Sequence, residues 1–135
     1  MARKTWVEKL NNNKKAEVKT CPKNIAGMKQ GQIMLVPTAR QFDDFIRGIP
    51  MGRAMSVQRV RAALAAANGA EVTCPITSGF HLRTVAEVAN ERLEAGYQPG
   101  DVTPIWRVLD EKSPVLARLD GGSTRFLALR REEGL

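Results

Sequence analysis

Basic and small polar side chains gather in the middle of this chain, where their types suit contact with an anionic polymer. They are Arg53, Arg59, Arg61, Ser78, His81, Arg83 and Thr84. Between positions 53 and 83 the four arginines are opposed by a single acidic residue, Glu71. Guanidinium groups neutralise phosphates, and small hydroxyl side chains let a nucleic-acid backbone approach closely. The sequence therefore predicts that this segment contacts DNA.

The other reactive residue types form no catalytic or metal-binding pattern. His81 is the only histidine, and Cys21 and Cys74 are far apart in the sequence. Zinc needs three or four ligands, and neither a CxxC nor an HxxxH spacing occurs. A hydrolase GxSxG turn and a lysine-containing phosphate loop are also missing. We expect no metal site and no cofactor, while Cys74 stays open as either a reactive thiol near a helix start or a small buried residue.

Two helices joined by a short connection are expected to position these side chains. Ser56 is a good N-cap residue, because its hydroxyl can accept a hydrogen bond from a free backbone N–H. Val57, Val60 and Leu64 then form one apolar stripe. Asn68-Gly69 is predicted to end this first helix, since glycine tolerates the left-handed conformation.

The second helix is predicted to begin near Thr77 or Ser78. Its apolar face comprises Leu82, Val85, Ala86, Ala89 and Leu93, and its opposite face comprises His81, Arg83, Thr84 and Glu87. A short helix pair whose second member carries polar and basic residues outward is typical of a helix-turn-helix.

Shorter elements are predicted on either side of this pair. The expected elements are a helical turn at 6–10, a strand at 33–36, a helix from Thr38 to Gly48, an extended segment at 103–109 and a last helix from Ser123 or Thr124 to Gly134. The helix after Thr38 begins with a capping box and buries Phe42, Phe45 and Ile46. The resulting fold class is mainly α, a winged helix-turn-helix-like domain with a short hairpin or extended segment.

The net charge of +7 is concentrated at the N-terminus of the 135-residue chain. Residues 1–32 hold eight Lys or Arg and two Glu, which gives +6, whereas residues 33–135 are nearly neutral at +1. We therefore divide the chain into a basic, partly ordered N-terminal arm, 1–32, and a DNA-binding domain, 33–135. The arm suits a polyanion through counterion release, or it serves as a solubilising tail.

Location is inferred from what the sequence lacks. No apolar run approaches the roughly 20 residues of a membrane span, and the N-terminus has no apolar signal-peptide core. We expect a cytoplasmic, nucleoid-associated protein with no membrane partner. In a reducing compartment, Cys21 and Cys74 are predicted to be free thiols.

Four motifs occur in an order that resembles the DNA-binding domain of alkylguanine-DNA alkyltransferases and alkyltransferase-like proteins. They are Ile49-Pro50-x-Gly52-Arg53 followed by Ser56, Leu82-Arg83-Thr84-Val85-Ala86, Pro104-Ile105-Trp106-Arg107-Val108, and Gly121-Gly122 followed by Glu133-Gly134. The family patterns are IPxGxVxTYGxIA, ARAVG, PCHRV and GG…EG, and the resemblance covers residues 37–135. It implies that Arg83 is the finger inserted into the duplex, that Ser78, His81 and Thr84 contact the DNA backbone, and that Arg53, Arg59 and Arg61 contact phosphates.

The departures from the family pattern argue against enzymatic activity. Ile105 stands at the alkyl-accepting cysteine and Trp106 at its activating histidine, so no thiolate can form there. Glu133 matches the third member of that set and is expected to have nothing left to orient. Ile105, Trp106, Arg107 and Glu133 therefore border a vestigial pocket, in which Trp106 either stacks on a base or packs in the core.

The resemblance implies a non-enzymatic protein that binds double-stranded DNA, recognises alkylated or damaged bases and contacts other DNA-repair proteins. Three alternatives stay open. A helix-turn-helix regulator would read intact duplex, an alkyltransferase would act through Cys74, and a protein-interaction module would keep the fold without binding DNA.

Overall fold

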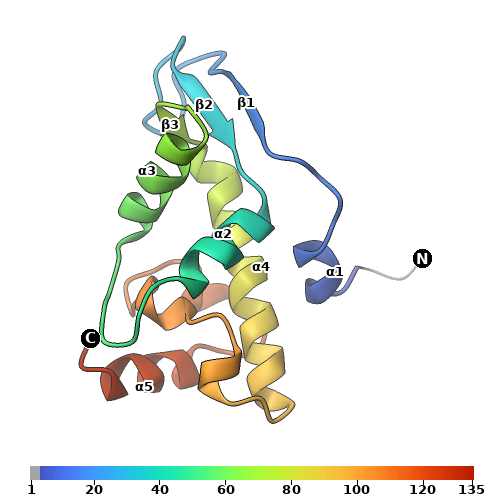
Figure 1. Ribbon diagram of the computed structural model, residues 1–135, viewed down its shortest axis with the longest axis vertical. Coiled ribbons are helices and arrows are strands. Elements are labelled where there is room, and N and C mark those ends of the chain that lie inside the picture. The colour runs from blue at the N-terminus through green and yellow to red at the C-terminus, as the bar shows by residue number, and fades with distance from the viewer. Residues whose placement is uncertain (1–3) are drawn as a thin grey trace.

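The computed structural model describes residues 4–135 as a mainly helical chain with a small three-stranded sheet (Figure 1). The α-helices are α1 (Trp6–Leu10), α2 (Ala39–Arg47), α3 (Val57–Ala67), α4 (Pro75–Glu94) and α5 (Thr124–Glu132). The strands are β1 (Glu17–Thr20), β2 (Ile33–Val36) and β3 (Val72–Thr73), and short 3-10 helices are η1 (Pro99–Asp101), η2 (Ile105–Arg107) and η3 (Leu116–Arg118). No helix among the described residues is long and apolar enough to cross a membrane.

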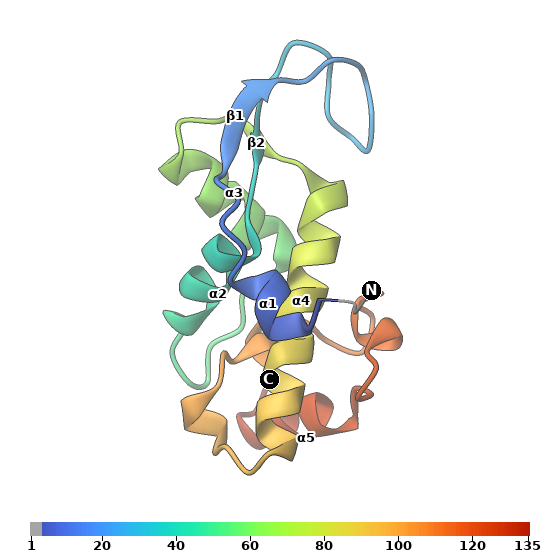
Figure 2. The ribbon, with the colours of Figure 1, turned by 90° about the vertical axis from the view of Figure 1, so that its right-hand side faces the viewer.

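The sheet ties the N-terminal segment to the helix pair. Its strand order is β1-β2-β3, with β1 antiparallel to β2 and β2 parallel to β3. Glu17 lies opposite Val36, and Met34 lies opposite Val72. A strand from within residues 1–32 is thus paired with the predicted strand at 33–36. Helix α1 also lies against α4, as Figure 2 shows.

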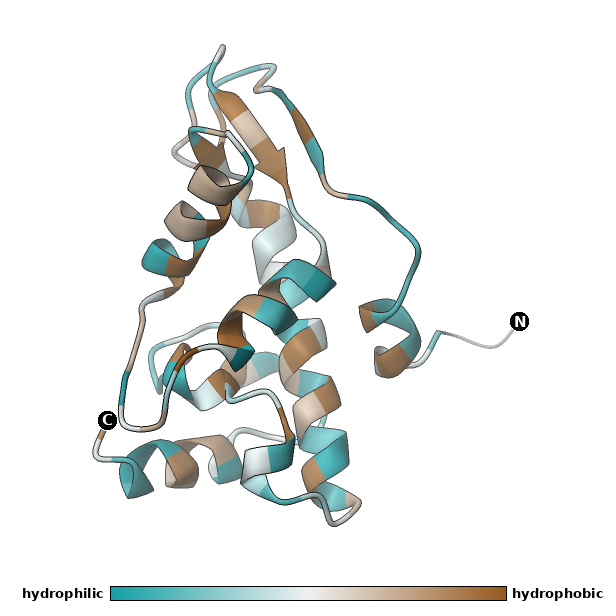
Figure 3. Cartoon of the chain, in the orientation of Figure 1, coloured by the Kyte–Doolittle hydropathy of each residue, from teal (hydrophilic) through white to brown (hydrophobic). Residues whose placement is uncertain are grey.

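Helix α4 is the central element of the core. Its predicted apolar face is confirmed, because Leu82, Val85, Ala86, Ala89 and Leu93 are all buried. Helix α2 packs on it and buries Phe42 and Ile46, while Phe45 is half-buried. Figure 3 shows hydrophobic and hydrophilic residues interspersed along both α2 and α4. One apolar cluster therefore links α2, α4 and the segment around η2.

The predicted helix starts agree with the structure at α2 and α3. Thr38 and Gln41 form the expected capping box, and the Ser56 hydroxyl accepts from the N–H of Arg59 at 3.2 Å. Gly69 follows α3 with a φ of 70°, in the left-handed region that favours glycine.

Two boundary predictions are wrong. Helix α4 begins at Pro75 rather than near Thr77 or Ser78, because proline fits the first helical turn and lacks only an N–H that would be unpaired there. The segment 103–109 is not extended but winds into η2, where the N–H of Arg107 bonds the carbonyl of Pro104 at 3.0 Å. Helix α5 starts at Thr124 as expected, although the Ser123 side chain makes no capping bond.

Candidate nucleic-acid interface

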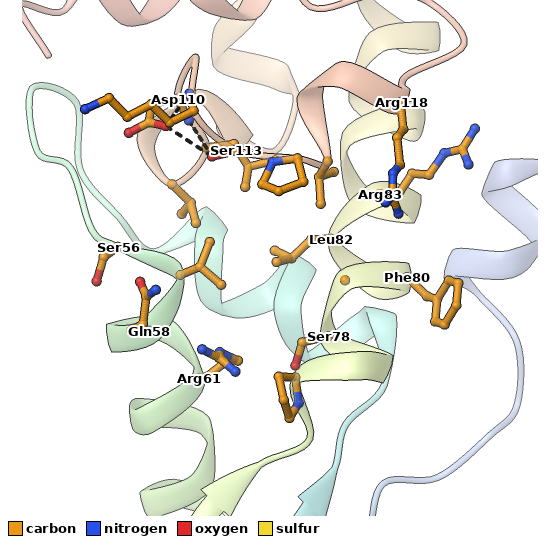
Figure 4. Close-up of a pocket in the computed structure, with 18 of the residues that line it drawn as sticks. Ser56, Gln58, Arg61, Ser78, Phe80, Leu82, Arg83, Asp110, Ser113 and Arg118 are labelled. Carbon is orange, nitrogen blue, oxygen red and sulfur yellow. Dashed lines mark hydrogen bonds between the residues drawn. The ribbon is translucent and has the colours of Figure 1, made fainter. Parts of the chain in front are cut away.

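A cavity of about 670 Å³ opens between α3, the first half of α4 and the chain that follows η2 (Figure 4). Helix α3 contributes Val57 and Arg61 to its wall, and α4 contributes Ser78 and Leu82. Apolar side chains of the third wall include Val108, Pro114 and Val115. Its volume lies within the range of ligand pockets, which have mostly apolar walls and a few placed polar groups.

The charged groups around this cavity are mostly basic. Arg61, Arg83, Lys112 and Arg118 line it, together with one carboxylate, Asp110. Asp110 already accepts hydrogen bonds from the N–H of Lys112 at 2.9 Å and the hydroxyl of Ser113 at 3.3 Å. The cavity therefore favours an anionic or electron-rich ligand.

Arg61 carries an unsatisfied donor. Among the residues that the structure describes, its Nε is a buried side-chain nitrogen with no hydrogen-bond partner. A buried donor without a partner costs free energy, and such groups are rare in native structures. An acceptor atom placed in the cavity next to Arg61 would remove this cost.

Ser78 and Thr84 are buried, and the predicted outward face of α4 is wrong for Thr84. Their hydroxyls donate to the carbonyls of Cys74, at 2.6 Å, and Phe80, at 3.0 Å. Ser78 still lines the cavity, whereas Thr84 does not. The Glu87 side chain, also predicted to face outward, is only 2 % exposed.

His81 is half-buried rather than freely exposed. Its ring centroid lies 6.4 Å from that of Phe42 on α2. Burial lowers the pKa of His81 below its usual value, against the opposing effect of the Pro37 carbonyl. The imidazole is therefore neutral at pH 7 and adds no positive charge to the α4 surface.

Arg83 belongs to an internal network instead of projecting freely. Its Nη2 pairs with Asp120 Oδ1 at 3.1 Å, and its Nε pairs with Glu87 Oε2 at 3.4 Å. The guanidinium lies 5.0 Å from the ring centroid of Trp6 on α1, and the Trp6 indole N–H donates to Asp120 Oδ2 at 3.3 Å. Helix α1 and the chain before α5 thereby hold the predicted finger in place.

The other predicted phosphate contacts lie apart from the cavity. Arg53, in the turn before α3, and Arg59, in the first turn of α3, are both exposed. Neither side chain lines the cavity, so of the predicted set the structure gathers Arg61, Ser78 and Arg83 around it.

The residues expected to border a vestigial pocket meet in a closed cluster. Ile105 and Trp106 are 0 % and 1 % exposed, and the Trp106 ring stacks on Phe126 at 6.1 Å. Stacking of Trp106 on a nucleobase is therefore excluded in this conformation, and its alternative, core packing, is confirmed.

Glu133 is the acceptor at the centre of this cluster, so the expectation that it has nothing to orient is wrong. Its carboxylate accepts from the Trp106 indole at 2.6 Å, from Arg107 at 2.9 and 3.0 Å, and from the N–H of Gly52 at 2.8 Å. Burial raises the pKa of Glu133, but these donors outweigh it and lower the pKa to about 2.

Both cysteines are free thiols, as predicted. Cys74 is 7 % exposed, occupies the N-cap position of α4 without a side-chain capping bond, and packs in a second apolar cluster with Cys21, Met28 and Met34. Burial raises its pKa, but the N–H groups of Thr77 and Ile76 outweigh that effect and lower it. Cys74 does not line the cavity. Within residues 4–135, no three His, Cys, Asp or Glu side chains gather in a group that could hold a metal ion.

Phe80, Lys112 and Arg118 also line the cavity, although none of them was predicted from the sequence. Lys112 and Arg118 follow no local pattern that would have singled them out. Phe80 did carry a signal, because Ile76, Phe80 and Arg83 recur at helical spacing outside the apolar stripe of Leu82 and Val85.

No family model matches the chain, and no curated protein or solved structure matches it either. The resemblance to alkyltransferase-like proteins thus depends on the four motifs alone.

Proposed function

We propose that this chain is a non-enzymatic DNA-binding protein of the alkyltransferase-like kind, with α3 and α4 acting as a winged helix-turn-helix. The cavity beside α4 takes an unpaired or alkylated base. The observation that carries this proposal is the cavity itself, about 670 Å³ in volume, with apolar walls, a basic lining and the unpaired Nε of Arg61.

The composition of the cavity fits a nucleobase. A base is flat and largely apolar on its faces, and Val57, Leu82 and Val108 offer apolar walls. Its edge carries carbonyl and ring-nitrogen acceptors, for which the Arg61 guanidinium is a suitable donor. The basic side chains around the cavity, Arg118 and Lys112, suit the flanking phosphates.

Binding without catalysis is favoured by the closed cluster next to the cavity. Alkyl transfer needs a thiolate and a neighbouring base, and the matching positions hold a buried isoleucine and a buried tryptophan. Glu133 is fully occupied by donors from Gly52, Trp106 and Arg107. These residues are held in internal contacts and supply no nucleophile.

The proposal is tested by fluorescence anisotropy with duplexes that carry alkylguanine, an abasic site or no lesion, each at two salt concentrations. We expect the wild-type protein to prefer a lesion duplex by about tenfold, and Arg61→Gln to remove most of that preference. Arg131→Gln is the matched control, because Arg131 is an exposed arginine on α5 outside the cavity. Its expected effect is below about twofold.

Each outcome separates the candidate functions. Failure of the wild-type protein to bind any duplex would overturn the proposal. Binding that depends on sequence and ignores lesions would indicate a regulator that reads intact DNA. Arg83→Ala is unsuitable as the main variant, since it also breaks the pairs with Glu87 and Asp120.

A further inference from the structure

The exposed surface of α4 next to the cavity, formed by Ile76 and Phe80, is apolar. Ile76 and Phe80, one helical turn apart, are 47 % and 68 % exposed. Phe80 is among the residues that line the cavity, and Figure 4 shows its ring pointing outward from α4 rather than into the centre of the cavity. Single exposed apolar residues are common, but this pair lies beside a basic cavity.

The backbone around Phe80 is open to close approach. Gly79 precedes it, and a Cβ built on Gly79 would meet no atom within 4 Å. Phe80 itself is 68 % exposed. A large partner can reach the ring without displacing any element.

The positive charge of the adjoining cavity favours an anionic partner for this surface. Arg61, Lys112 and Arg118 lie around the adjoining cavity with one carboxylate, Asp110, so the lining keeps an excess of positive charge. Arg83 also lines the cavity, but its charge is paired with Glu87 and Asp120. An apolar ring beside a basic cavity suits a polyanion that has an apolar interior. Double-stranded DNA has that construction, with phosphates outside and stacked bases inside.

We propose that Phe80, with Ile76 beside it, is the wedge that enters the DNA between two base pairs and unstacks the base taken up by the cavity. Apolar side chains inserted between base steps kink and partly unstack a duplex. This inference rests on the proposed function and assigns the insertion to a residue other than the predicted finger, Arg83.

The internal contacts explain why Phe80 inserts in preference to Arg83. Moving Arg83 into DNA would break its pairs with Asp120 and Glu87 and its contact with Trp6. The Glu87 carboxylate, 2 % exposed, would then keep only the N–H of Asp120 as donor. Removing one partner of a buried charge is costly, whereas inserting Phe80 breaks no side-chain hydrogen bond.

The test combines affinity with a readout of unstacking. A duplex carries 2-aminopurine beside an abasic site, because the fluorescence of this base rises when it leaves the stack. For Phe80→Ala we expect about tenfold weaker binding and loss of the fluorescence rise. Phe80→Leu keeps an apolar wedge and is expected to stay within about threefold of the wild-type protein.

Tyr97→Ala is the matched control, since Tyr97 is an aromatic residue that is 51 % exposed beyond the C-terminal end of α4. Its affinity is expected to change by less than about twofold. Thermal unfolding of each variant checks the fold, and because both rings are exposed we expect unchanged midpoints.

The outcomes keep the two proposals apart. If the wild-type protein ignores DNA, or binds only an acidic polypeptide such as polyglutamate, both are overturned. If it binds lesion DNA and Phe80→Ala matches it, only the wedge is overturned. Weaker binding of Phe80→Ala with an undiminished fluorescence rise also overturns the wedge, because Phe80 would then be a contact that does not unstack.

Discussion

Glu133 connects three separate parts of the chain at the residue scale. Its carboxylate accepts from Gly52 before α3, and from Trp106 and Arg107 in η2, while Arg107 also donates to the carbonyl of Ile49 at 2.7 Å. Hydrogen bonds to a charged group stabilise more than neutral ones do. One side chain near the C-terminus therefore holds the turn that leads into α3.

Replacing Glu133 with glutamine is expected to lower the free energy of unfolding at pH 7 by about 2 kcal/mol, because a charged acceptor is lost. The folded-state pKa of about 2 lies below the ordinary value of 4.5. The stabilisation is therefore fully present above about pH 4.5 and is lost as the pH falls toward 2. Urea unfolding at several pH values should show the wild-type and Glu133→Gln proteins converging over that interval.

The control for this prediction is Glu132→Gln, which removes the same charge from an exposed neighbour. Its unfolding free energy should stay within about 0.5 kcal/mol of the wild-type value. A gap between Glu133→Gln and wild type that does not change with pH would show that packing, not the carboxylate charge, is what the substitution removes.

Individual residues also show the limit of motif matching. The four motifs include Gly52, Trp106, Arg107 and Glu133, and these residues meet in the structure. Their roles could not be derived in the same way. A missing catalytic pair implied an idle carboxylate, but an indole N–H and a guanidinium are donors that occupy it equally well.

At the scale of elements, the apolar periodicity of α4 predicted one face and missed the second. Leu82, Val85 and Ala89 face the core as their spacing implies. Thr84 and Glu87 are buried as well, because α1 packs on α4 and the N–H of Asp120 bonds the Glu87 carboxylate at 2.9 Å. Periodicity within one helix carries no information about distant segments that cover its polar side.

The turn before α5 is held to α4 by a close approach. Asn90 Nδ2 donates to the carbonyl of Gly122 at 2.9 Å, and a Cβ on Gly121 would lie 2.6 Å from that same nitrogen. Gly121→Ala should therefore push the buried Asn90 amide away from its acceptor. We expect a loss of about 1–2 kcal/mol of unfolding free energy, measured by urea unfolding.

Gly100→Ala is the matched control for that substitution. A Cβ on Gly100 would meet no atom within 4 Å, and its φ is not in the left-handed region. Its stability should be unchanged or raised by up to about 1 kcal/mol, since alanine restricts the unfolded chain. Equal losses in both variants would mean that the Gly121 contact relaxes without cost.

At the scale of the whole molecule, positive charge is concentrated in an N-terminal segment that packs against the rest of the fold. The N-terminal segment carries most of the net charge of +7, and it is fixed to the body through α1 and β1. The charge of Lys14 contributes to the lowered pKa of His81, and that of Lys19 to the lowered pKa of Cys74, while Lys19 also pairs with Glu17 at 3.8 Å. The predicted arm thus extends the basic surface around the start of α4.

If DNA lies across this surface, Lys14 and Lys19 each neutralise a phosphate. Replacing both with glutamine should make the negative slope of log affinity against log salt shallower by about two, since each phosphate contact contributes about −0.9 to that slope. The preference for a lesion duplex should not change, because neither side chain lines the cavity. Arg125→Gln with Arg131→Gln removes the same charge from exposed positions on α5. An equal fall in slope for that pair would mean that DNA responds to net charge alone and that the molecule has no oriented binding face.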